Sequence, residues 1–381
     1  MKPHLGRIAG VLIFLAAIAA GVVWQFRPHP VTANQPGSMR SAAPESVGVP
    51  GVPVGPEVAL MGKVGGEKIG FLEDPVLKSL LARSGLSITA KKAGSVEMVR
   101  DPVTGQNFLW PASQVDLENF KSAGGSAMQA EEIFQSPLVF YSWDIVTDAL
   151  VTNGIVERLG ETFYVVDLAK LVALVDRKAK WTELGLTRFY SSVLIQSTDP
   201  ARSNSGNMWA ALLANTYNGG DVLTSDKADA IIPKIKTFFD RVGFMEASSG
   251  TLFDKFLKQG AGAYPIIVAY ENQLLEFTAD HPELIDPVRQ KLRILYPRPT
   301  VWASHPLIAL DNNSKRLIAA LKDPAVQRLA WEKHGFRSGL MGAVSTNGLS
   351  LGGIPATIDG VMQIPSLAVM SRLTDALTPQ K

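Results

Sequence analysis

Cysteine is absent from this chain of 381 residues. A disulfide framework, a thiolate metal site and a cysteine nucleophile are therefore excluded, and the absence suits an oxidising compartment. The five histidines show no metal-ligand spacing, and three of them, His29, His281 and His305, precede proline, which marks loop or strand-edge positions. We therefore expect neither a metal nor a cofactor.

An excess of charge of one sign is also missing. Lys and Arg together number 37 and Asp and Glu 35, so the formal net charge is +2 at pH 7. Nucleic-acid-binding proteins usually carry a basic stripe, and this sequence has none. It also lacks a P-loop, an HExxH motif and a Gly-rich dinucleotide fingerprint. These absences argue against a nucleic-acid partner and against an enzyme, so we expect no turnover of ester or phosphoester substrates.

One long apolar run is present, at the N-terminus. Residues 8–26 carry no charge, and as a helix they would extend about 28 Å, close to the ~30 Å hydrocarbon core of a bilayer. Lys2 and Arg7 favour a cytoplasmic stub at residues 1–7. We predict an uncleaved single-pass anchor in the cell membrane, with the body of the protein in the periplasm or extracellular space. A cleaved signal sequence is the alternative, and it would export the same body.

Residues 27–62 are rich in Pro and Gly and have no periodic apolar spacing, which predicts a linker. Beyond them, short apolar strands alternate with amphipathic helices, beginning with a strand near residues 67–72 and a helix that contains Leu77, Leu80 and Leu81. This alternation predicts an α/β protein with parallel sheets. Its small polar motifs fall at strand ends, where open α/β sheets bind ligands.

The order of these motifs resembles that of type 2 periplasmic solute-binding proteins, in the molybdate, sulfate and phosphate branch. The resemblance rests on KKAGSVEM, WPASQ, SPLVFYSW, STDPARSNSG, SSGTLFDKFL, AYENQLLEF, ILYPRPTVWASHPLIAL and DPAVQRLAWEKHGFRSG. It implies two small α/β lobes joined by a hinge, with lobe I at residues 63–143 and 297–381 and lobe II at residues 144–296. It also implies a small polar or anionic solute, bound between the lobes for an ABC permease or another membrane partner.

Carried over position by position, the resemblance implies ligand contacts from both lobes. The residues concerned are Gly94, Ser95, Ser113, Ser203, Asn204, Ser205, Gly206 and Tyr270. One departure is FLEDP at residues 71–75, where oxyanion binders of this branch often place a small hydroxyl residue. A small oxyanion is therefore a less suitable ligand for this chain.

The residues themselves allow alternatives. The polar run from Ser203 to Gly206 precedes an apolar helix, and a helix cap would need only one of its acceptors. Glu271 would repel a bare dianion, which favours a ligand with hydrogen-bond donors, but it could equally pair with a Lys or Arg at the hinge. Arg202 could complement an anion or cover the surface. A non-transport interaction or scaffold module of the cell envelope, built on the same fold, remains the alternative function.

Overall fold

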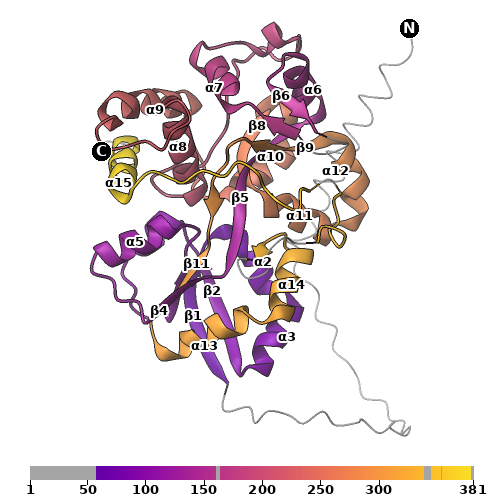
Figure 1. The fold of residues 1–381 in the computed structure, drawn as a ribbon. Coiled ribbons are helices and arrows are strands. Elements are labelled where there is room, and N and C mark those ends of the chain that lie inside the picture. Colours follow the sequence, from indigo (N-terminus) through magenta and orange to yellow (C-terminus); the bar gives the residue numbers. More distant parts are fainter. Residues whose placement is uncertain (1–56, 160–163, 339–344, 353, 379–381) are drawn as a thin grey trace, which may run out of the picture.

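The computed structural model describes residues 57–159, 164–338, 345–352 and 354–378. Within these ranges the chain forms two α/β lobes, each built around its own sheet (Figure 1). The predicted anchor at residues 8–26 and its cytoplasmic stub lie outside the described residues. None of the helices in the described part combines the length and apolar character that a bilayer crossing requires.

Lobe I contains a five-stranded sheet in the order β2-β1-β3-β11-β4, in which β1, β2 and β3 run parallel and β11 is antiparallel to its neighbours. Its strands are β1 (Val58–Val64), β2 (Leu86–Lys92), β3 (Phe108–Trp110), β4 (Gln129–Glu132) and β11 (Pro306–Ala309).

Alternate residues of these strands enter two different cores. Phe108 and Trp110 pack with α2 (Ile69–Glu73), α3 (Pro75–Arg83), α13 (Asn312–Leu321) and α14 (Pro324–Glu332), whereas Leu109 packs with α4 (Ser95–Arg100) and α5 (Gln114–Ser122). Successive strand side chains point to opposite faces, so helices cover both faces of this sheet.

Lobe II contains the second sheet, in which β8 (Ile266–Tyr270) and β9 (Leu292–Pro297) flank the second half of β5 (Phe134–Trp143), and β7 (Tyr164–Val166) and β6 (Val156–Arg158) continue beyond β9. Its helices are α6 (Asp144–Thr152), α7 (Leu168–Asp176), α8 (Asn204–Tyr217), α9 (Ala228–Val242), α10 (Ser249–Ala263), α11 (Glu271–Asp280) and α12 (Ile285–Lys291), with 3₁₀ turns η2 (Trp181–Leu184) and η3 (Pro282–Leu284). Every residue of α8 from Asn204 to Asn215 is buried, so α8 forms the centre of this lobe.

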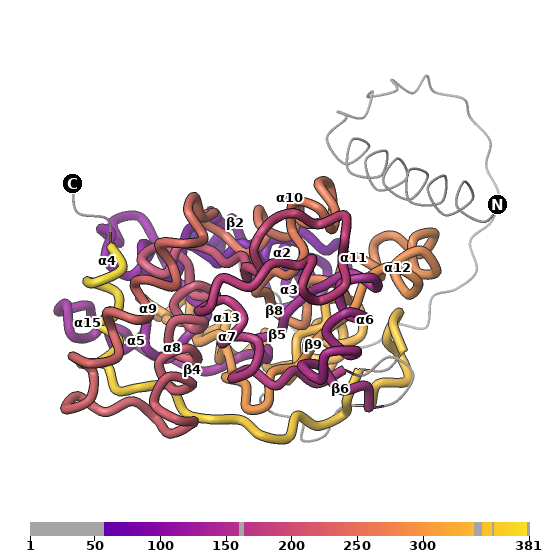
Figure 2. The backbone as a smooth tube through the Cα atoms, turned by 90° about the horizontal axis from the view of Figure 1, so that it is seen from above, coloured from indigo at the N-terminus to yellow at the C-terminus, as the bar shows by residue number. Residues whose placement is uncertain are grey.

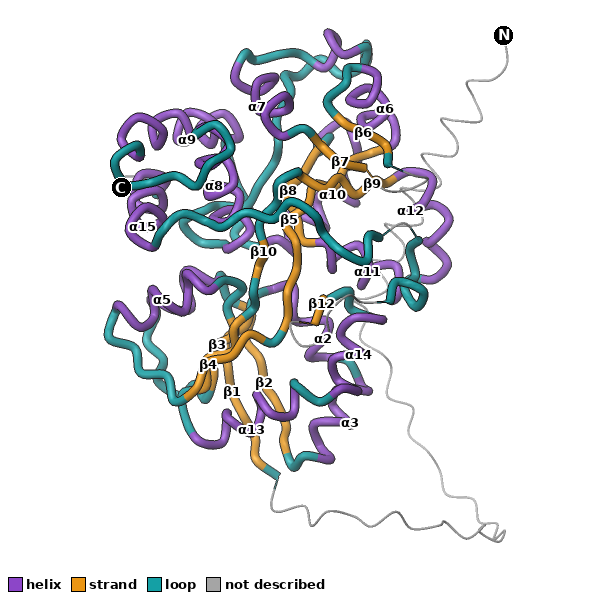
Figure 3. The backbone as a smooth tube through the Cα atoms, viewed as in Figure 1, coloured by secondary structure: helices purple, strands orange, loops and turns teal. Residues whose placement is uncertain are grey.

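The hinge is built on β5, which passes from lobe I to lobe II (Figure 3). Its first half pairs with β10 (Trp302–Ala303) and β12 (Arg337–Ser338), and its second half with β8 and β9. The chain returns to lobe I through β9, β10 and β11. The two lobes are therefore held together by neighbouring extended segments.

Three local expectations differ from the structure. Val58–Gly62, expected in the linker, belongs to β1, because Leu60 and Val64 alternate into the core. Residues 67–72 form the 3₁₀ turn η1 (Gly66–Lys68) and α2 instead of a strand, since Phe71 and Leu72 pack from one turn of helix. The last helix, α15 (Leu367–Leu377), packs on α8 and α9 of lobe II as well as on α5, although we assigned it to lobe I (Figure 2).

Candidate functional site

Four helical N-termini meet at one small cavity between the lobes. They belong to η1 and α4 of lobe I and to α8 and α10 of lobe II. The cavity has a volume of about 10 Å³, which is room for about one water molecule. Its lining residues are Gly65, Gly66, Glu67, Ala93, Gly94, Ser95, Ser203, Asn204, Ala247, Ser248, Ser249 and Tyr270.

Three of these N-termini have no side-chain cap. The N-cap residues of η1 and α4 are Gly65 and Gly94, and the N-cap of α8 is Ser203, whose hydroxyl does not bond the first-turn amides. The Ser203 hydroxyl instead lies 3.2 Å from the Ser205 hydroxyl, which bonds Thr198 at 2.7 Å. First-turn amides carry partial positive charge and commonly bind anionic or polar ligand groups. Three N-termini without side-chain caps therefore line the cavity.

Asn204 connects the two lobes at the cavity wall. Its Nδ2 donates to the Ala112 carbonyl at 3.1 Å and to the Tyr270 hydroxyl at 2.9 Å, while its buried Oδ1 has no partner. Ser95 lies on the opposite wall and accepts from the Ala112 amide at 3.2 Å. An unpaired buried acceptor costs free energy, so the Asn204 oxygen is a free binding position for a donor.

A buried charged cluster lies next to this cavity, and we did not predict it from the sequence. Glu67 and Lys68 form an ion pair, and Asp116 and His305 lie close to it. Burial lowers the pKa of Lys68, opposed by Glu67, and burial raises the pKa of Asp116 to about 7, opposed by Lys68. Burial also lowers the pKa of His305 well below its usual value, and neither of its ring nitrogens has a hydrogen-bond partner among the described residues. The two glycines that follow β1 are the only sequence signal for this position.

A larger cavity of about 420 Å³ continues the cleft outward from Gly66 and Glu67. We call it the acidic chamber, because its wall carries more carboxylates than basic groups. Its charged and aromatic lining comprises Glu73, Asp254, Glu276, Asp280, Lys92, His281, Phe253 and Phe277. Carboxylates at this density repel a dianion and favour hydrogen-bond donors or cations.

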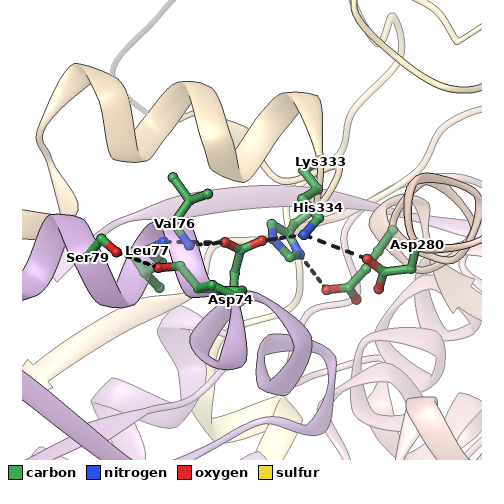
Figure 4. Close-up of polar contacts among 9 residues, drawn as sticks. Asp74, Val76, Leu77, Ser79, Asp280, Lys333 and His334 are labelled. Carbon is green, nitrogen blue, oxygen red and sulfur yellow. Dashed lines mark hydrogen bonds and ion pairs between the residues drawn. The ribbon is translucent and has the colours of Figure 1, made fainter. Parts of the chain in front are cut away.

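The lobes are also joined beside this chamber by the network that Figure 4 shows. The buried His334 places Nδ1 2.6 Å from Glu276 of lobe II and Nε2 3.1 Å from Asp74 of lobe I. Lys333 bonds Asp74 and lies 3.8 Å from Asp280. Burial alone would raise the pKa of Asp74, but hydrogen bonds from Lys333, the Val76 amide and His334 lower it. Opening the lobes at this point would separate charged partners.

The structure thus brings together five of the residues named from the sequence: Gly94, Ser95, Ser203, Asn204 and Tyr270. It places the other five elsewhere. Ser113 caps α5 by accepting from the Val115 amide at 3.0 Å. Arg202 pairs at 2.7 Å with Glu97 of lobe I on the exposed edge of the cleft.

Glu271 lies outside the cavity, because its carboxylate is occupied. Arg337 donates to it at 2.6 Å and 2.8 Å, and the Tyr296 hydroxyl donates at 2.8 Å. The alternative interpretation, a pairing with a basic residue at the hinge, is therefore the one that the structure supports.

Ser205 and Gly206 support the local fold. Ser205 bonds Thr198 and Ser203, as described above. A Cβ atom on Gly206 would lie 2.2 Å from the Thr198 carbonyl oxygen. Glycine at this position therefore allows the start of α8 to pack closely against the Thr198 backbone, and it does not serve to admit a ligand.

We expect Gly206→Ala to lower the free energy of unfolding by at least about 1 kcal/mol, because backbone atoms must shift to admit the methyl group. Chemical denaturation of the variant and the wild type measures this difference. The matched control is Gly262→Ala, since no atom lies within 4 Å of a Cβ there. Equal stability of the Gly206 variant and the wild type would contradict this role of Gly206 in backbone packing.

Residues 348–352 have the spacing Gly-x-Ser-x-Gly of a nucleophile elbow. They lie in a loop rather than in a strand-to-helix turn. The Ser350 hydroxyl pairs with the Thr278 hydroxyl at 2.7 Å, and no histidine in the described part of the chain bonds it. The pentapeptide therefore lacks the geometry of a catalytic nucleophile.

No protein-family model and no curated protein sequence matches this chain. Solved structures do. A periplasmic thiamin binding protein aligns with TM-score 0.55 and 12% identity over 86% of this chain and 98% of its own. Iron-bound HitA from Pseudomonas aeruginosa aligns with TM-score 0.53 and 11% identity over 84% and 100%.

A third structure, the periplasmic binding protein AfuA from Actinobacillus pleuropneumoniae with fructose-6-phosphate bound, aligns with TM-score 0.52 and 13% identity over 83% and 96%. All three are binding proteins. The chain therefore has the two-lobed α/β fold of type 2 periplasmic solute-binding proteins, as the motif order indicated.

Proposed function

We propose that this protein is an extracytoplasmic solute-binding protein that closes its two lobes around a small polar solute. The solute would be delivered to an ABC-type transporter or sensed by a membrane partner. The observation that carries the proposal is the interlobe cavity, where uncapped helix N-termini from both lobes meet the unpartnered Asn204 oxygen. The binding proteins that share the fold support binding over catalysis.

Binding requires the lobes to separate. A cavity of about 10 Å³ is too small for any solute larger than water. The interlobe contacts that must break are the Arg202–Glu97 pair, the Asn204–Ala112 bond and the contacts of His334. In a hinge motion, the backbone dihedral angles of a few residues change while the domains move as rigid bodies. The neighbouring crossings at β5 and β9–β10 are suited to such a motion.

The solute chemistry follows from the charges around the cleft. Helix N-termini favour an anionic or polar group at the inner end, whereas Glu67 and the acidic chamber disfavour an uncompensated dianion. We therefore propose a solute that carries hydrogen-bond donors, such as a hydrogen phosphate ester, a hydroxylated compound or a zwitterion. The three similar structures are a thiamin binding protein, an iron-bound protein and a protein with fructose-6-phosphate bound, so the fold admits ligands of either charge.

One observation favours the second candidate, an envelope interaction module with an inactive cleft. The inner end of the cleft is lined by the protein's own Glu67, which forms an ion pair with Lys68. A thermal-shift screen with oxyanions, phosphoesters, amino acids and sugars separates the two candidates. A ligand at 100 times its dissociation constant adds about 2.7 kcal/mol of stability. Stabilisation by one class supports solute binding, and no response from any class favours the interaction module.

Asn204→Ala is expected to weaken the solute found in that screen about three- to tenfold, because one neutral hydrogen bond is worth about 0.5–1.5 kcal/mol. Titration calorimetry measures the affinity. Asn153→Ala is the matched control, since Asn153 bonds the Ala149 carbonyl at the end of α6 and does not line the cleft. Unchanged affinity in the Asn204 variant would place the solute elsewhere.

We further propose that residues 8–26 remain attached and anchor the protein, with the body outside the cytoplasm. The full-length protein should then sediment with membranes and resist extraction by carbonate, because an apolar segment of this length matches the bilayer core. N-terminal sequencing of the mature protein is the second measurement. A soluble form that begins between residues 20 and 45 would contradict the anchor and indicate a cleaved signal sequence.

A further inference from the structure

Lobe II contains a further cavity, of about 540 Å³, lined by residues of β6, β9 and α12 and by Leu351, Gly352 and Ile354. Small-molecule sites typically measure about 300–1,000 Å³. We call this cavity the arginine pocket. Among the described residues, three arginines line it, Arg158, Arg289 and Arg293, together with one carboxylate residue, Asp148. The excess of positive charge is the opposite of that in the acidic chamber.

The guanidinium groups of the arginine pocket are held in place. Arg293 donates through Nη1 to the Arg289 and Leu292 carbonyls, at 2.8 Å each, while its buried Nε has no partner. Arg158 and Arg293 each lie 5.9 Å from the ring of Tyr164. Arg289 donates to the Ser350 carbonyl at 3.2 Å and lies 3.7 Å from the exposed Asp286 carboxylate. Arginine has five N–H donors, so these carbonyl bonds leave donors of Arg289 and Arg293 for a ligand.

The arginine pocket is separate from the interlobe cleft. Helix α11 lies between them: Leu274 lines the pocket, whereas Gln273, Glu276 and Phe277 line the acidic chamber. No residue belongs to the linings of both. A ligand in the arginine pocket therefore does not compete directly with a solute in the cleft.

We propose that the arginine pocket is a second binding site, for a small organic anion with two or more negative charges on carboxylate or phosphate groups. The planar fork of arginine matches both groups with paired hydrogen bonds. The ring of Tyr164 and the side chains of Leu351 and Ile354 form an apolar wall on which the carbon skeleton of the anion rests. The proposal is independent of the function assigned to the cleft.

Titration calorimetry with citrate and with glycerol 3-phosphate tests this site on the full-length protein in detergent, at 150 mM NaCl. We expect at least one probe to bind, and Arg289→Gln and Arg293→Gln each to weaken it at least about tenfold, as for the loss of a charge-assisted hydrogen bond. Arg188→Gln, at an exposed arginine outside the pocket, controls for net charge. Asn204→Ala controls for binding in the cleft. Neither control should change the affinity.

Three results would overturn the proposal: no heat from either probe at 10 mM, wild-type affinity in both pocket variants, or loss of binding in Asn204→Ala or Arg188→Gln. If Arg293→Gln does not fold, Arg293→Lys replaces it. That variant keeps the charge but loses the fork, so weakened binding supports the site and unchanged binding counts against it.

Discussion

Replacing Arg337 with methionine is expected to lower the free energy of unfolding by about 3–5 kcal/mol, because it leaves the Glu271 carboxylate buried without its charged partner. Both side chains are almost fully inaccessible, at 6% for Arg337 and 0% for Glu271. Arg337 also donates to the Pro355 and Ala356 carbonyls, so the loss would release part of the C-terminal segment as well. Urea denaturation followed by circular dichroism measures the change.

The matched control for this prediction is Arg372→Met. Arg372 pairs with Asp229 at the surface, with side-chain exposures of 38% and 90%, and exposed pairs contribute about 0–1 kcal/mol. The double variant Glu271→Gln with Arg337→Met should recover part of the loss, since it removes the stranded charge. A loss below 1 kcal/mol in Arg337→Met would mean that the hinge is not held by this pair.

The second large effect is a dependence of stability on pH that becomes visible when Asp116 is replaced by asparagine. The pKa of Asp116 is raised to about 7 by burial, against about 3.9 in an unfolded chain. A raised carboxyl pKa contributes stability that is complete below about pH 3.9 and is lost as the pH rises toward 7. The stability of Asp116→Asn minus that of the wild type should therefore increase by about 2–3 kcal/mol between pH 4.5 and 6.5.

His305 provides the control of opposite sign. Burial lowers its pKa well below the usual value of 6.5, so its contribution is present above about pH 6.5 and is lost as the pH falls. The stability of His305→Asn minus that of the wild type should therefore decrease between pH 4.5 and 6.5. Asparagine suits this position because the backbone φ is 33°, a value that asparagine tolerates better than most residues. Parallel pH profiles for Asp116→Asn and the wild type would show that Asp116 is ionised when folded.

The part of the candidate site that the family resemblance implied and the structure brings together consists largely of helix N-termini. Gly94-Ser95 and Ser203-Asn204 each combine small or polar residues with a following apolar helix, and this pattern is local. The structure places both pairs on one cavity. Of the two alternatives for Glu271, the structure shows the pairing with a basic residue. Local patterns could not choose between them, because Arg337 lies 66 positions away in the sequence.

The buried charged cluster shows even more clearly that local sequence does not reveal which distant residue a side chain will contact. The sequence pattern predicts a strand that contains Glu67 and Lys68, because EKIGFLE is apolar enough for either a strand or a helix. Once β1 occupies Val58–Val64, these two residues fall at the turn that enters the cleft. Only then do they meet His305, which is contributed by the return crossing more than 200 positions later.

Composition, the near-neutral charge and the alternation of strands with helices were enough to determine an α/β protein without a cysteine-based site, since these properties depend on residue type and short spacing. The order of the motifs indicated two lobes. Tertiary structure alone decided which charges are buried together, that the arginines of lobe II share one pocket, and that α15 packs across to α8 and α9. These features depend on contacts between residues that are distant in the chain, and local patterns carry no information about such contacts.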